Sequence, residues 1–142
     1  MTARGRAGRG ADDDGSILPL TLGYAVLAIA LVYVCACATS LYLAQKRLDA
    51  VADAAALAGA DGFALVLVGE EAQATLTDVG VAAQAAAVVA DSGLAQLIDA
   101  GTPDGVSARV TVSARWGPPL LSAFAPDTVV LTATATSRTA LR

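Results

Sequence analysis

An uncharged apolar run from Gly15 to Ala44 constrains the fold of this 142-residue chain more than any other feature. An α-helix rises about 1.5 Å per residue, so about twenty apolar residues suffice to cross the hydrocarbon core of a membrane. A lone strand would leave its backbone polar groups without partners in lipid, so the run is expected to be helical. We therefore predict a transmembrane helix over residues 15–44, with a tail before it and one small domain after it.

The residues that flank the run predict its orientation. Residues 1–14 are Arg, Gly and Asp with almost nothing to bury, which predicts a disordered tail. Three arginines precede the run and two basic residues follow it: Arg4, Arg6 and Arg9, then Lys46 and Arg47. The positive-inside rule counts basic residues near the ends of a span. It places the tail in the cytoplasm and residues 45–142 outside it, as a single-pass protein of the cell membrane.

Proteolytic processing within the run is an alternative. Ala36-Cys37-Ala38 has the small-x-small form of a signal-peptidase site, and Val34 to Cys37 half resembles a lipoprotein box. The apolar run is longer than a usual signal-peptide core, and it continues past both sites through Leu43. A processed lipoprotein or secreted domain thus stays a rival to an anchored protein, and the mass of the mature chain would separate them.

The helix is predicted to continue beyond the apolar run. Residues 45–60, QKRLDAVADAAALAGA, contain no Pro and no Gly before Gly59, and Ala and Leu favour helix. One narrow face of this stretch carries Leu48, Val51, Ala55 and Ala58. A second helical region is expected from about Glu70 to about Ala100, interrupted near Ser92, with its apolar stripe at Leu76, Val79, Ala83, Ala86 and Ala90. Residues 63–68, FALVLV, allow either a buried strand or an extended connector.

The sequence switches to a period of two after residue 105. One face is expected to be dry and carries Val106, Ala108, Val110, Val112, Ala114 and Trp116. Arg109 and Thr111 lie on the opposite, wet face. A closing strand from Thr128 to Arg138 is predicted to pair with this strand as a C-terminal antiparallel β-hairpin, covered by the second helical region. The expected fold class is α+β.

The residues that carry chemistry are sparse. The chain has no His, which removes the commonest general base and metal ligand. Asp49 and Asp53 lie one helical turn apart, but a solvated helix face explains them and nothing else converges on them. We expect no catalytic residue, no metal, no cofactor and no small-molecule substrate. Because no basic patch carries interleaved aromatic residues, we also expect no nucleic-acid partner.

The segment from Gly15 to Gly62 resembles the TadE/TadG-like proteins of Flp (tight adherence) pilus loci, in particular the TadG-like N-terminal region. The likeness lies in a short tail, Gly15-Ser16, the apolar span and the stretch KRLDAVADAAALAGA. The positions that match the family pattern are Arg47, Leu48, Ala52, Asp53, Ala54, Ala55, Ala56, Leu57, Ala58 and Ala60. Asp49, Val51 and Gly59 depart from that pattern.

The resemblance implies a structural role in a Flp/Tad-type pilus or related secretion apparatus, as a minor pilin-like component with a long pilin-like helix. The implied partners are the membrane and other pilin-like or Tad-platform proteins, a second copy included. The expected assembly surface comprises Arg47, Leu48, Ala52, Asp53, Ala55, Ala56, Leu57 and Ala58, because small residues let helices approach closely. The rival function is a membrane-anchored extracytoplasmic binding module unrelated to pili.

Processing at Gly15-Ser16 is also implied by the resemblance, since related pilins are cleaved after a Gly. Those proteins usually carry a Glu about five residues into the mature helix, whereas this chain has Leu20 there, preceded by Pro19.

Overall fold

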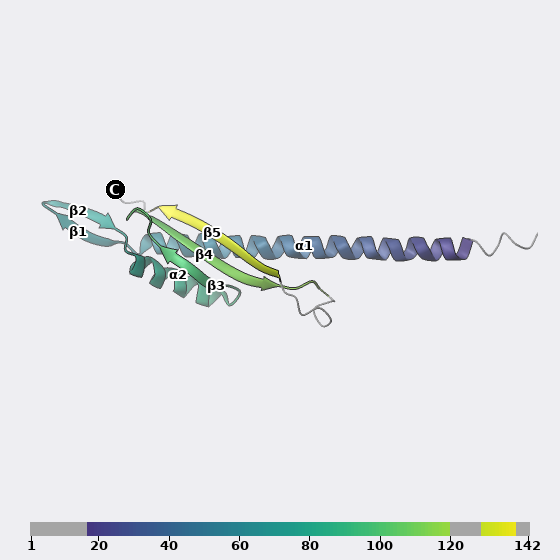
Figure 1. The fold of residues 1–142 in the computed structure, drawn as a ribbon. Coiled ribbons are helices and arrows are strands. Elements are labelled where there is room, and N and C mark those ends of the chain that lie inside the picture. The colour runs from purple at the N-terminus through teal and green to yellow at the C-terminus, as the bar shows by residue number, and fades with distance from the viewer. Residues whose placement is uncertain (1–16, 120–128, 139–142) are drawn as a thin grey trace, which may run out of the picture. The chain divides into compact units, whose positions relative to one another are not determined.

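The computed structural model describes residues 17–119 and 129–138 (Figure 1). In chain order the elements are α1 (Ile17–Asp61), β1 (Ala64–Val68), β2 (Glu71–Thr75), α2 (Asp78–Ser92), β3 (Gln96–Gly101), β4 (Ser107–Trp116) and β5 (Val129–Arg138). A long apolar N-terminal helix, a second helix and antiparallel strands confirm the predicted α+β class. The predictions for residues 1–14 and for the cleavage site at Gly15 and Ser16 lie outside the described residues.

The chain divides into two compact units between Ala38 and Thr39. In the first unit the described residues, from Ile17 to Ala38, are a single stretch of α1. The most apolar part of α1 buries none of its side chains, and the helix is long and apolar enough to cross a membrane. A core helix of a soluble domain would bury such residues, so their exposure fits a helix that meets lipid.

The second unit is built on a three-stranded antiparallel sheet with the order β3-β4-β5. β4 and β5 pair over their full length, from Ser107 opposite Arg138 to Trp116 opposite Val129. Along β4 the side chains of Ala108, Val110 and Val112 are fully buried, as the alternation predicts. Val106 differs, because it precedes the strand and is exposed. The opposite face is wet, and there the hydroxyls of Thr111 and Thr134 hydrogen-bond across the strands at 2.9 Å.

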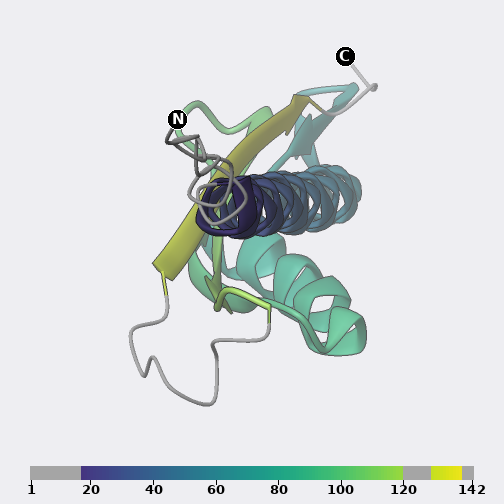
Figure 2. The ribbon, with the colours of Figure 1, turned by 90° about the vertical axis from the view of Figure 1, so that its right-hand side faces the viewer.

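Two helical segments cover the dry face of this sheet. α2 lies beside the C-terminal half of α1 in both views of the fold (Figures 1 and 2). The core is formed mainly by small side chains: Leu48, Ala52, Ala55, Ala56 and Ala60 from α1, Val81, Ala85 and Val89 from α2, and Leu131, Ala133 and Ala135 from β5, with the three β4 residues. The prediction that the second helical region covers the strands is therefore incomplete, because α1 also packs into the same core.

Gly59 marks the point of closest approach between α1, α2 and β4. A Cβ atom placed on Gly59 would lie 3.0 Å from Cγ1 of Val81 and 3.3 Å from Cβ of Ala108. Both distances are shorter than ordinary van der Waals contact, so a larger residue would push the three elements apart. This packing explains why Gly stands at this position.

The second helical region differs from its prediction in both bounds and phase. Residues from Glu71 to Thr75 form a strand, and α2 begins only after its cap at Thr77, whose hydroxyl accepts a hydrogen bond from the Gly80 N–H at 3.2 Å. The helix ends at Gly93, whose φ of 60° is left-handed. The segment predicted to continue it as helix is the edge strand β3.

The predicted apolar stripe of α2 was wrong by more than a third of a turn. Val79 is 81% exposed, and Ala83, Ala86 and Ala90 are also exposed. The helix instead buries Val81, Ala85 and Val89. Because alanine or valine occupies most positions of this helix, several faces have similar hydrophobicity, and contact with α1 and the sheet decides between them.

The stretch FALVLV proves to be a strand, but not a buried one. β1 pairs with β2 through the two-residue turn Gly69-Glu70, and Gly69 has a φ of 71°, as the tight turns of hairpins require. Leu65 and Leu67 point into solvent, Leu67 with 74% of its surface exposed. The pair forms a two-stranded arm of the second unit (Figure 1).

Candidate assembly surface

The residues of the expected assembly surface divide into two sets on opposite sides of α1. Leu48, Ala52, Ala55 and Ala56 are buried in the core of the second unit. Arg47, Asp53 and Leu57 are exposed, and Ala58 is half-buried. The expectation of a surface is thus corrected for the four buried residues, because α2 and the sheet already cover them. Leu48 and Ala55 belong to the narrow apolar face seen in the sequence, so the sequence indicated in part which side of α1 the domain covers.

The exposed side of α1 carries a continuous strip that begins near the start of the second unit. The strip consists of Leu43, Arg47, Ala50, Ala54 and Leu57, which follow one another at helical spacings of three and four. The side chains of Ala50 and Ala54 are small, so another helix could approach the backbone closely there. Leu43 and Leu57 lie at either end and supply larger apolar contacts. We call these five residues the outer strip.

Gln45 fastens α1 to the sheet, a role that sequence reasoning missed. Its Nε2 group donates to the backbone carbonyl of Thr132 on β5 at 3.1 Å and to Oδ1 of Asp49 at 2.9 Å. Lys46 Nζ lies 3.3 Å from the other carboxylate oxygen of Asp49. The hydrogen bond from Gln45, with help from Lys46, lowers the pKa of Asp49. Asp49 therefore takes part in a structural contact and forms no unit with Asp53.

Trp116 fastens the end of β4 to α1 at a point that precedes Gln45. Its indole Nε1 donates to the Ser40 hydroxyl at 3.2 Å. From the sequence, Trp116 was predicted only to lie on the dry face of a strand. A tryptophan on such a face also has an indole N–H that needs a hydrogen-bond acceptor, and this acceptor was not predicted. The folded domain thus contacts α1 from about Ser40 onward, inside the run predicted to be lipid-embedded.

Asp104 organises the turn between β3 and β4. Its carboxylate accepts hydrogen bonds from the Val106 and Ser107 N–H groups at 3.1 and 2.6 Å, and from the Ser107 hydroxyl at 2.9 Å. The Arg138 guanidinium, at the end of β5, lies 3.8 Å away. The Val106 N–H first, then the Ser107 groups and Arg138, lower the pKa of Asp104. This contact holds the start of β4 against the end of β5.

The side chains that commonly ligate metals are dispersed in the described part of the chain. Among residues 17–119 and 129–138 there is no group of three or more His, Cys, Asp or Glu side chains that could hold a metal ion. Cys35 and Cys37 lie within the apolar run, and neither forms a disulfide among the described residues.

Comparison with known proteins relates only the N-terminal part of the chain to a known family. Residues 15–62 match the family model described as "Putative Flp pilus-assembly TadE/G-like". No curated protein and no solved structure matches the chain. The matched segment ends one residue beyond α1, so it contains the apolar run and the helix face on which the domain packs. Residues 15–62 therefore carry a TadE/G-like domain of Flp pilus-assembly proteins, as the resemblance predicted.

Proposed function

We propose that this chain is a membrane-anchored structural component, minor pilin-like, of a Flp/Tad-type pilus or a related secretion apparatus. The family match over residues 15–62 carries the proposal. The structure supports it by giving α1 two different parts. From Ile17 to Ala38 the helix exposes apolar side chains suited to lipid, and from Ser40 onward it is the scaffold of a small domain. The proposal includes no catalytic role.

The proposed membrane span is somewhat shorter than the apolar run. Because Trp116 contacts Ser40, we propose that the lipid-embedded part ends near Thr39. At about 1.5 Å per residue, the helix from Ile17 to Thr39 is about 34 Å long, enough for a hydrocarbon core of about 30 Å. Residues 1–14 would form the cytoplasmic tail and the domain from Ser40 to Arg142 would be extracytoplasmic.

A reporter enzyme that is active only outside the cytoplasm, fused after Arg142, should be active. The basic residues before the span outnumber those close behind it, and this difference orients a single-pass helix. The matched control is the same fusion with a reporter that is active only in the cytoplasm, which should be silent. A silent first reporter together with an active cytoplasmic reporter would show that the orientation is the reverse of the one proposed.

Purification of the full chain in mild detergent should recover pilin-like or Tad-platform proteins encoded beside it. An unrelated single-pass protein with the same tag and expression level serves as the control. Intact mass is measured on the same sample, because an unprocessed chain has a mass of 14.1 kDa and cleavage at Gly15 or near Cys37 would reduce it. Recovery of no assembly protein from membranes that contain the apparatus would favour the rival binding module. A mature mass that lacks the span would favour the secreted domain.

A further inference from the structure

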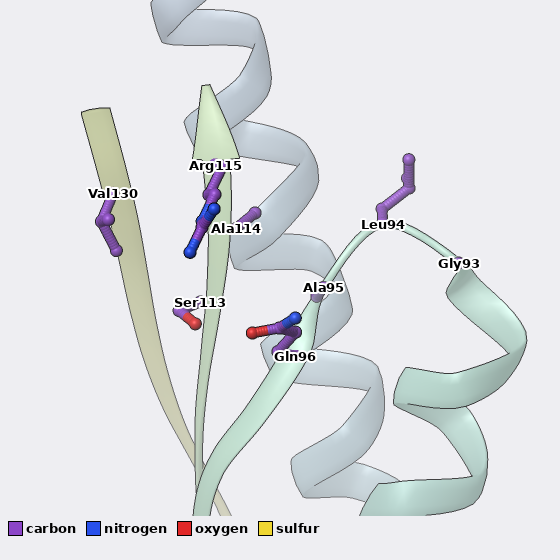
Figure 3. A pocket seen from close by; sticks show the side chains of 8 residues that line it. All are labelled: Gly93, Leu94, Ala95, Gln96, Ser113, Ala114, Arg115 and Val130. Carbon is purple, nitrogen blue, oxygen red and sulfur yellow. The ribbon is translucent and has the colours of Figure 1, made fainter. Parts of the chain in front are cut away.

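A notch opens in the second unit between the end of β4 and the segment that leads into β3 (Figure 3). β3 begins at Gln96 opposite Ser113, so the last residues of β4 have no β3 residue opposite them. A cavity of about 480 Å³ lies in this opening, and a smaller one of about 130 Å³ lies between β4 and α1. Leu94, Ala114 and Arg115 line both cavities. We call the two together the arginine notch.

The walls of the arginine notch are basic and its floor is apolar. Arg47 from α1 and Arg115 from β4 line the smaller cavity, over the side chains of Ala44, Leu48 and Val51. Among the described residues that line the two cavities, none is acidic. Within the described residues, neither guanidinium makes an ion pair or hydrogen bond, whereas Lys46 and Arg138 both pair with carboxylates. Two unpaired arginines beside an apolar surface suit an anion with an apolar part.

The larger cavity adds neutral polar groups to this arrangement. Gln96 and Ser113 lie close together on adjacent strands, and both side chains line the opening (Figure 3). An amide and a hydroxyl can each donate and accept hydrogen bonds. They therefore suit hydroxyl groups attached to the anion, which a cluster of arginines alone would not recognise.

The arginine notch lies on the part of α1 where the apolar run ends. Ala44 is both the last residue of that run and part of the notch floor. Trp116, which follows Arg115, donates to Ser40, and the exposed Tyr42 ring lies 5.9 Å from Lys46 Nζ. Tryptophan and tyrosine are enriched at membrane–water interfaces, and basic residues there attract anionic lipids.

We propose that the arginine notch binds the headgroup of an anionic phospholipid that carries hydroxyl groups, of the phosphatidylglycerol type. Arg115, which lines both cavities, and Arg47, which lines the smaller one, supply positive charge for the phosphodiester. The headgroup hydroxyls lie near Gln96 and Ser113, and the apolar floor meets the lipid backbone. The proposal depends on the proposed membrane span and not on the pilus role. An acidic peptide is the less suitable occupant, since the smaller cavity is mostly apolar and is lined by Ala44, the last residue of the apolar run.

The test uses the full chain in micelles of a zwitterionic detergent, with lipid binding followed by native mass spectrometry. Dioleoyl phosphatidylglycerol should bind the wild type more tightly than dioleoyl phosphatidylcholine does. The double variant Arg47→Gln/Arg115→Gln should bind phosphatidylglycerol at least about tenfold more weakly, because each lost charged hydrogen bond weakens binding by about that factor. Arg47→Lys/Arg115→Lys keeps both charges and should retain part of the affinity. Arg109→Gln, an exposed arginine on β4 outside both cavities, should bind like the wild type.

Four results would overturn the proposal. The double variant could bind phosphatidylglycerol as tightly as the wild type does, or the wild type could bind the two lipids equally. Inorganic phosphate could compete fully with phosphatidylglycerol, or an acidic peptide could bind in place of the lipid. Inorganic phosphate competition would indicate a free anion as the ligand, and peptide binding would indicate a protein partner. Resistance of every variant to alkaline extraction from membranes is measured in parallel. Loss of that resistance would contradict the span, whereas lost lipid selectivity in an inserted protein contradicts only the notch.

Discussion

Val110→Asp should abolish accumulation of the folded protein in the membrane fraction. Val110 is 0% exposed and belongs to the core between the sheet and the helices. A carboxyl group there would have no partner, at a cost of about 4 kcal/mol or more. A small domain has a total stability of only about 5–15 kcal/mol, and a core of small side chains places this one toward the lower end. Immunoblotting of isolated membranes measures the level, and circular dichroism of the purified chain measures its unfolding.

Thr111→Asp is the matched control for this experiment. It places the same charge on the neighbouring residue of β4, on the wet face of the sheet. The substitution removes the hydrogen bond between the Thr111 and Thr134 hydroxyls, which lowers the free energy of unfolding by about 1 kcal/mol. The protein should therefore accumulate almost normally. If both variants disappear equally, the alternation of β4 does not separate a dry face from a wet one.

Ala55→Leu should lower the melting temperature of the purified chain by roughly 10 °C. Ala55 is 0% exposed, and the added carbon atoms would enter a core that has no room for them. Such overpacking costs about 1–3 kcal/mol, and each kcal/mol shifts the melting temperature of a domain of this size by about 4–8 °C. Thermal unfolding in detergent, followed by circular dichroism, measures the shift.

The adjacent variant Ala54→Leu separates stability from assembly. Ala54 lies on the outer strip, and leucine is nearly as good a helix former as alanine, so stability should be unchanged. If the outer strip contacts a partner helix, the bulk of leucine should reduce recovery of assembly proteins in mild detergent. Normal recovery with Ala54→Leu would place the assembly contact elsewhere. Equal destabilisation by both variants would contradict the assignment of faces on α1.

The parts of the fold that were predictable have strong patterns in the sequence. β4 alternates apolar and polar residues, and this pattern alone indicates which side is dry. The apolar run before Gln45 has no charged residue, which leaves helix as the only suitable structure in lipid. In both cases side chains of clearly different polarity occur at a regular spacing, so the prediction did not depend on tertiary contacts.

The parts that were missed are those where alanine makes neighbouring positions equivalent. In α2 the difference between Val79 and Val81 is decided by what packs against the helix, and in α1 the same holds for Ala54 and Ala55. β3 was missed because the stretch LAQLIDA suits a short helix as well as a strand, and pairing with β4 decides between them. The contacts from Trp116 to Ser40 and from Gln45 to Thr132 join residues far apart in the sequence, which no local pattern can indicate.

The burial of the motif alanines changes what the family pattern encodes. Ala52, Ala55, Ala56 and Ala60 each have room for little more than a methyl group, so selection for packing alone would keep them small. In this chain the alanine pattern thus reflects the packing of the small domain on its helix. Partner choice would be encoded instead where side chains are free to vary in size and charge, on the outer strip and on the solvent side of the sheet.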